Sequence, residues 1–155
     1  MANDIEELKS ALAPWLGSVC VQLAFHEDAD LWVFEFDSVG HINASCPWRI
    51  VALGGIALTN IDHEQKFGLS APIDVRVQTL ALLSGRRVVG TEIALVTGDL
   101  KVVFEGDTTL ELFNNSSGYE GWNAVADHGT GSNFLIAQGG GTVALFKDSL
   151  DMRLK

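Results

Sequence analysis

Two passages of the chain carry apolar residues in the same order. DADLWVFEFDSVGHINA occupies residues 28–44, and GDLKVVFEGDTTLELF occupies residues 98–113. Moving the first passage forward by 68 positions aligns Trp32 with Leu100, Phe34 with Val102, Phe36 with Phe104, Ile42 with Leu110 and Ala44 with Leu112. Agreement over two strands and the turn between them indicates that one structural unit occurs twice, which restricts the fold more than any other feature.

The same offset of 68 reaches back to the start of each half. It aligns Ile5 with Ile73, Leu12 with Leu80, Gly17 with Gly85, Val21 with Val89 and Phe25 with Ile93. An insertion of six residues within NNSSGYEG then brings Trp48 opposite Trp122. We therefore predict a single domain, residues 1–155, built from two repeats of about 1–60 and 72–147 that a connector, residues 61–71, joins.

Each half reads as a helix followed by strands. In the first half the predicted elements are a helix over 5–15, strands over 19–25, 32–36, 40–44, 48–53 and 56–58; in the second they are a helix over 73–83 and strands over 88–95, 100–105, 109–113, 122–126, 134–137 and 142–147. Short turns between alternating strands favour antiparallel hairpins. The predicted fold class is α+β, mostly antiparallel, with two repeats related by a pseudo-twofold axis and the helices covering the sheets.

Composition excludes several classes of function. Ten basic and twenty acidic residues give a net charge of −10, which repels a nucleic-acid backbone. The start, MANDIEELKSALAPWLG, has neither the apolar run of a secretory signal nor that of a membrane span, so we expect a cytoplasmic protein without a membrane partner. Cys20 and Cys46 are then expected to be reduced, with Cys20 buried.

Three short clusters combine histidine with acids, which are the usual nitrogen and oxygen ligands of metals. They are His26-Glu27-Asp28, Asp62-His63-Glu64 and Asp127-His128. None has the spacing of a known motif, so we expect solvated loops, no metal, no cofactor and no intrinsic catalytic centre. Asp62, His63 and Glu64 lie in the connector near the expected axis, where a metal-dependent enzyme would place its site; a role of Asp62 in bonding loop N–H groups is the favoured alternative.

Trp48 and Trp122 take equivalent places in the two halves. They are expected to fill the core where the halves meet. The alternative is a small-molecule platform at this junction, with Arg49 and Glu120 as its polar groups. The complete alternative ligand site is Trp48, Arg49, Asp62, His63, Glu64, Glu120 and Trp122.

Negative charge is concentrated in the first half, since residues 1–70 carry −7 and residues 71–155 carry −3. The segment 26–37 contains no Lys or Arg and five acids: Glu27, Asp28, Asp30, Glu35 and Asp37. We call these five residues the acidic ridge and predict that they form the binding site for a basic protein. A solvated face without a partner is the alternative.

The segments WVFEFD, PWRI, DHEQKFGL, GDLKVVFEGDTTLEL and YEGW together give the chain a family resemblance. It resembles a family of small bacterial proteins without a characterised function, some of which are similar to immunity proteins that neutralise a toxin. The resemblance implies a non-enzymatic bacterial protein and carries over no catalytic residue. We therefore expect an acidic protein-binding module, of the immunity type, that inhibits a basic partner; the sequence leaves its oligomeric state undetermined.

Overall fold

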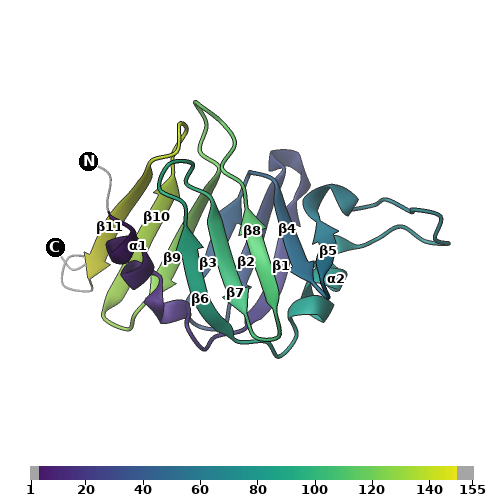
Figure 1. Cartoon of the computed structure of the whole chain (residues 1–155), viewed down its shortest axis with the longest axis horizontal. Coiled ribbons are helices and arrows are strands. Elements are labelled where there is room, and N and C mark those ends of the chain that lie inside the picture. The colour runs from purple at the N-terminus through teal and green to yellow at the C-terminus, as the bar shows by residue number, and fades with distance from the viewer. Residues whose placement is uncertain (1–3, 150–155) are drawn as a thin grey trace.

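The computed structural model describes residues 4–149, which contain eleven strands in two sheets and two α-helices (Figure 1). The α-helices are α1 (Ile5–Ala11) and α2 (Val75–Leu83), and the short 3-10 helices are η1 (Ala13–Trp15), η2 (Glu27–Ala29) and η3 (Asn60–Asp62). The strands are β1 (Cys20–His26), β2 (Leu31–Phe36), β3 (Gly40–Ala44), β4 (Trp48–Ala52), β5 (Gly55–Thr59), β6 (Val88–Ile93), β7 (Leu100–Phe104), β8 (Thr108–Leu112), β9 (Trp122–Asp127), β10 (Gly131–Ala137) and β11 (Val143–Ser149). The predicted α+β class with mostly antiparallel strands is confirmed.

Capping residues set the start of both helices. The Asp4 carboxylate accepts a hydrogen bond from the Glu7 N–H at 2.8 Å, so α1 begins directly after it. Asp74 accepts from the Arg76 N–H at 3.0 Å, and α2 therefore begins two residues later than the expected Ile73. Pro14 lies in the 3-10 turn η1 that follows α1, which is why the first α-helix is shorter than predicted.

Each sheet combines strands from both halves of the chain. Sheet A has the order β1-β2-β3-β9-β10-β11, and sheet B has the order β5-β4-β8-β7-β6. All the strand pairs are antiparallel. Strands β9 and β10 of the second half continue a sheet begun by the first half, while β4 and β5 continue the sheet begun by the second. The two halves therefore cannot be separated without breaking both sheets.

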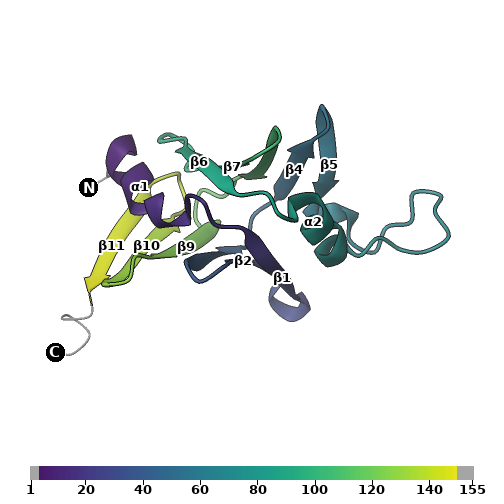
Figure 2. The same ribbon diagram turned by 90° about the horizontal axis from the view of Figure 1, so that it is seen from below.

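The two sheets pack face to face around one core. The Trp48 ring of sheet B meets the Trp32 and Phe34 rings of sheet A at centroid distances of 5.4 and 5.0 Å. Helix α1 packs against β6 at one side of the sandwich, and α2 packs against β1 and β5 at the other (Figure 2). The helices thus close the open sides between the sheets, whereas the sequence predicted that they would cover the sheets.

Polar bonds fix the first helical segment to sheet A. The buried side chain of Asn133 donates from Nδ2 to the Ala11 carbonyl at 3.0 Å, and the Trp15 indole donates from Nε1 to the Val125 carbonyl at 3.1 Å. These bonds connect the start of the chain to strands from its second half. In residues 4–149 no helix is both long enough and apolar enough to cross a membrane.

Candidate functional site

The acidic ridge is divided between the two ends of β2. Glu27 and Asp28 lie in η2, and Asp30 follows it with a positive φ of 48°; Glu35 and Asp37 lie at the opposite end. Six strand residues span about 20 Å, so the two groups occupy different places on the surface. All five side chains are exposed. The acidic ridge therefore consists of two separate groups of acids rather than one continuous row.

None of the five ridge acids forms an ion pair within residues 4–149. Asp37 accepts a hydrogen bond from the Ser38 hydroxyl at 3.3 Å, which leaves its charge uncompensated. Exposed charges act over roughly 8 Å at physiological salt. The surface at each end of β2 therefore presents a negative field to solvent.

Asp62 and His63 have structural roles at the root of the connector. The Asp62 carboxylate accepts from the Thr59 N–H at 2.9 Å, as the loop-stabilising interpretation predicted. His63 accepts from the Val75 N–H through Nδ1 at 3.1 Å, and its ring meets the Phe25 and Trp32 rings edge-on. Within residues 4–149 no group of three or more His, Cys, Asp or Glu side chains is arranged to hold a metal ion.

The remaining residues of the alternative ligand site point in different directions. Trp48 and Trp122 are each 1% exposed in the core, as expected, and the Trp122 indole donates to the Gly98 carbonyl at 2.8 Å. Glu120 accepts from the Asn123 side chain at 2.6 Å. Arg49 lies on the outer face of sheet B. The structure therefore does not bring the seven residues together at one opening.

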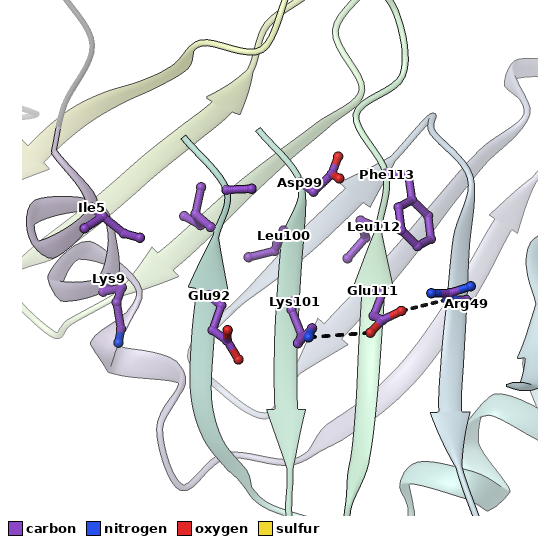
Figure 3. Close-up of a pocket in the computed structure, with 12 residues that line it drawn as sticks. Ile5, Lys9, Arg49, Glu92, Asp99, Leu100, Lys101, Glu111, Leu112 and Phe113 are labelled. Atoms are coloured by element: carbon purple, nitrogen blue, oxygen red, sulfur yellow. Dashed lines mark hydrogen bonds and ion pairs between the residues drawn. The ribbon is translucent and has the colours of Figure 1, made fainter. Parts of the chain in front are cut away.

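Arg49 belongs instead to a shallow groove of about 480 Å³ on the outer face of sheet B (Figure 3). Four side chains stand directly opposite one another on β4, β8, β7 and β6, in the order Arg49, Glu111, Lys101 and Glu92. Ile5 and Lys9 of α1 form one side of the groove. The sequence alone does not reveal this row, because its members lie far apart along the chain and share only an outward position in alternating strands.

Charges in this groove largely neutralise one another. Glu111 lies 2.7 Å from the Arg49 Nε and 3.7 Å from the Lys101 Nζ, with its side chain 15% exposed. The Arg49 guanidinium also lies over the Phe113 ring, 5.0 Å from its centroid. Cross-strand pairs of this kind stabilise a sheet. The charged residues of the groove therefore stabilise sheet B by pairing across its strands.

The two cysteines are buried and unpaired, as the sequence predicted for Cys20. Burial raises the pKa of the Cys20 thiol to about 11 and that of the Cys46 thiol to about 12. A nucleophilic cysteine needs a lowered pKa and access to solvent. Neither thiol is suited to covalent catalysis.

Comparisons with known proteins give no matching family model, and no curated protein or solved structure is significantly similar to the chain.

Proposed function

We propose that the fold is a pair of repeats related by a pseudo-twofold axis, with the strands of the two repeats exchanged between sheets. In the aligned repeats, each of the first five strands of sheet A has a counterpart in sheet B: β1 corresponds to β6, β2 to β7, β3 to β8, β9 to β4 and β10 to β5. The counterparts follow one another in the same order in sheet B, read from β6 to β5. The pairs agree in register: Cys20 pairs with Phe36 and Val88 with Phe104, and each pairing is followed by a bulge. This agreement supports duplication.

Backbone details also agree between the proposed repeats. Positive φ angles occur at Gly17 (84°) and Gly85 (70°), at Asp30 (48°) and Gly98 (78°), and at Ser38 (62°) and Gly106 (77°). Each pair is separated by 68 residues. Superposition of residues 5–58 on 73–136 in an experimental structure tests the proposal, and a different strand order in the two halves would contradict it.

We propose that the chain is an acidic protein-binding module, an immunity-type inhibitor that docks a basic surface of another protein. The observation that carries this proposal is that all five acids of the ridge are exposed and lack ion pairs in the described part of the chain. Complementary charge speeds encounter and disfavours wrong partners. Three of the five acids, Glu27, Asp28 and Asp30, lie together at one end of β2 and concentrate negative charge there.

Charge steers a partner but does not hold it, so the surface also needs apolar contacts. Trp32 is only 3% exposed and cannot supply them. The outer face of sheet A can, because Glu35, His41, Val125, Phe134 and Phe146 form one cross-strand row. Phe146 at its end is 55% exposed. An apolar centre with charged residues at its rim is the usual anatomy of a protein interface.

Two further properties belong to this proposal. We infer that the protein works in the cytoplasm, because a reducing compartment suits its two unpaired cysteines. We also infer membership of the bacterial family that the sequence resembles. Binding requires neither a metal nor a cofactor.

The test begins with affinity capture of a basic protein from the host lysate and its identification by mass spectrometry. Association of the purified pair is then measured with the variant Glu27→Gln/Asp28→Asn/Asp30→Asn. We expect an association rate about tenfold lower at low salt and a weaker salt dependence. Asparagine tolerates the positive φ at Asp30, so the turn is retained.

A matched control removes the same charge elsewhere. Glu6→Gln/Glu92→Gln/Asp107→Asn changes three exposed acids outside the ridge. If only total charge matters, both triple variants will slow association equally, and the ridge is not the site. Capture of only acidic proteins would also contradict the proposal.

A further inference from the structure

The connector forms an arm that projects from the body of the molecule between η3 and α2 (Figures 1 and 2). We call residues 64–72 the arm, and all of them are exposed. Its tip carries two large apolar side chains, Phe67 and Leu69, which are 69% and 58% exposed. Exposed apolar side chains of this size stabilise a complex when a partner buries them.

Backbone hydrogen bonds close the arm at its root and at its tip. The Glu64 N–H donates to the Ile73 carbonyl, and the Ile73 N–H donates to the Gln65 carbonyl, both at 2.8 Å. At the tip, the Leu69 N–H donates to the Lys66 carbonyl at 2.7 Å. Binding to the arm therefore requires little further ordering of its backbone.

The root of the arm packs against the β1–β2 hairpin. The His63 ring meets the Phe25 and Trp32 rings edge-on, at centroid distances of 5.5 and 5.4 Å. Phe25 pairs with Trp32 across the hairpin, and the next pair, His26 with Leu31, is the last before its turn. That turn carries three acids of the ridge: Glu27, Asp28 and Asp30. The arm therefore begins beside the larger group of ridge acids.

A small polar pocket of about 230 Å³ lies between the turn and the root of the arm. Asp30 and Trp32 of the hairpin line it together with Asn60 of η3, and Asn115 contributes a second amide. Among the described residues, Asp30 is the only charged one that lines the pocket. Carboxylate and amide oxygens accept hydrogen bonds from ammonium and guanidinium groups. The pocket therefore fits the end of a lysine or arginine side chain.

Charge decides which partner fits this end of the molecule. Residues 26–30 and 60–77 together contain two bases and six acids. The acids are Glu27, Asp28, Asp30, Asp62, Glu64 and Asp74. Of the bases, Arg76 lies 3.1 Å from the Asp74 carboxylate and is paired with it, so Lys66 alone opposes the remaining acids. This excess of negative charge attracts a basic partner and repels a second copy of the acidic chain.

We propose that the arm and the acidic turn beside it form a binding site for a basic amphipathic segment of the partner protein. Apolar side chains of that segment pack on Phe67 and Leu69, and its basic side chains face the acids of the turn, one of them in the Asp30 pocket. The inference rests on the proposed function, because it specifies which kind of basic surface the protein binds. The apolar row of sheet A lies beside Glu35 at the opposite end of β2, so the arm gives this group of acids its own apolar contacts.

A synthetic peptide tests the site in the full chain. The probe is a helix-forming peptide of about 14 residues, roughly 21 Å long, with lysine on one face and leucine on the other. The comparison peptide keeps the lysines and has glutamine in place of leucine. Calorimetric titration should show that the wild-type protein binds the lysine–leucine peptide about tenfold more tightly. Equal affinities, or no binding of either peptide, would overturn the inference.

Two variants separate the apolar contacts from the charged ones. Phe67→Asn/Leu69→Ser should abolish the tenfold preference for the leucine peptide, and asparagine tolerates the φ of 47° at position 67. Asp30→Asn should weaken binding of both peptides about fivefold at low salt and by less at high salt. These side chains are exposed, so tryptophan fluorescence of the variants should remain that of the folded protein.

Each variant has a matched control away from the site. Leu95→Ser/Val96→Ser removes two exposed apolar side chains from the turn between β6 and β7, and Asp107→Asn removes an exposed acid with a φ of 54°, close to the 48° of Asp30. Both controls should bind the peptides as the wild type does. Equal losses in the controls, or an unchanged preference in the arm variant, would overturn the inference.

Failure of this inference is distinguishable from failure of the proposed function. The proposed function depends on the association rate of the captured partner with the acidic-ridge variants, which the arm substitutions should leave unchanged. If the ridge variants slow association but the arm variant keeps its preference for leucine, the arm inference is wrong and the proposed function stands.

Discussion

Gly40 stands where β3 of the first half pairs with β9 of the second, and Gly40→Ala should destabilise the protein strongly. Its φ is 125°, and an added Cβ would overlap the backbone carbonyl of Val125. The same carbonyl accepts the Trp15 indole hydrogen bond, and the Cβ would lie 3.2 Å from that indole nitrogen. Relief of the overlap must therefore move either the β3–β9 junction or the Trp15 ring.

Three costs add in this variant. The positive φ costs about 1–2 kcal/mol, separation of packed backbone costs about 1–3 kcal/mol, and loss of the indole hydrogen bond costs about 1 kcal/mol. The sum, about 3–6 kcal/mol, is a large part of the roughly 5–15 kcal/mol that stabilises a typical domain. Gly54→Ala is the control, because Gly54 has a φ of 82° but nothing within 4 Å of the added Cβ. It should incur the first cost alone.

Urea unfolding followed by tryptophan fluorescence measures the free energy of unfolding of both variants. The signal reports on the core, because the four tryptophans are all buried: Trp15, Trp32, Trp48 and Trp122. We expect Gly40→Ala to lower the free energy of unfolding by about 2–4 kcal/mol more than Gly54→Ala does, which corresponds to a Tm lower by roughly 10 °C. Equal losses would refute the close approach of β3 and β9. The strand exchange between the halves would then be wrong as well.

Two further predictions concern the groove and the thiols. Glu111→Gln should lower the free energy of unfolding by about 1 kcal/mol at low salt and by less at high salt, because Arg49 and Lys101 lose the carboxylate that pairs with them. In the same urea titration, Glu92→Gln should have almost no effect. Equal effects of the two substitutions would show that the Glu111 ion pairs do not stabilise sheet B. The native Cys20 thiol should react with dithionitrobenzoate at pH 8 about 100-fold more slowly than the unfolded chain, because a pKa of about 11 instead of 9.0 lowers the thiolate fraction by that factor. Because the unfolded thiols lose their protons above about pH 9 while the folded ones keep theirs, the free energy of unfolding should fall between pH 9 and 11; fast native labelling would contradict the burial.

Local pattern was sufficient for most of the individual elements. Trp32, Phe34 and Phe36 alternate with polar or smaller residues, and β2 forms there with these three side chains in the core. The acids of the ridge were found for the same reason, because charged residues next to a strand turn are excluded from the core. The end of the second helix at Leu83 was also predicted from the glycine at position 85.

What the sequence by itself determined was therefore the set of strands, their inward faces and the spacing of 68 residues between similar segments. Only the tertiary structure decided that β9 joins β3 and that β4 joins β8, because the pairing of distant strands depends on closing one core from both halves. It also placed Arg49, Glu111, Lys101 and Glu92 in one row, although they lie on four separate strands. Side-chain periodicity fixes which face of a strand is buried, whereas the neighbour of that strand is set by packing across the whole chain.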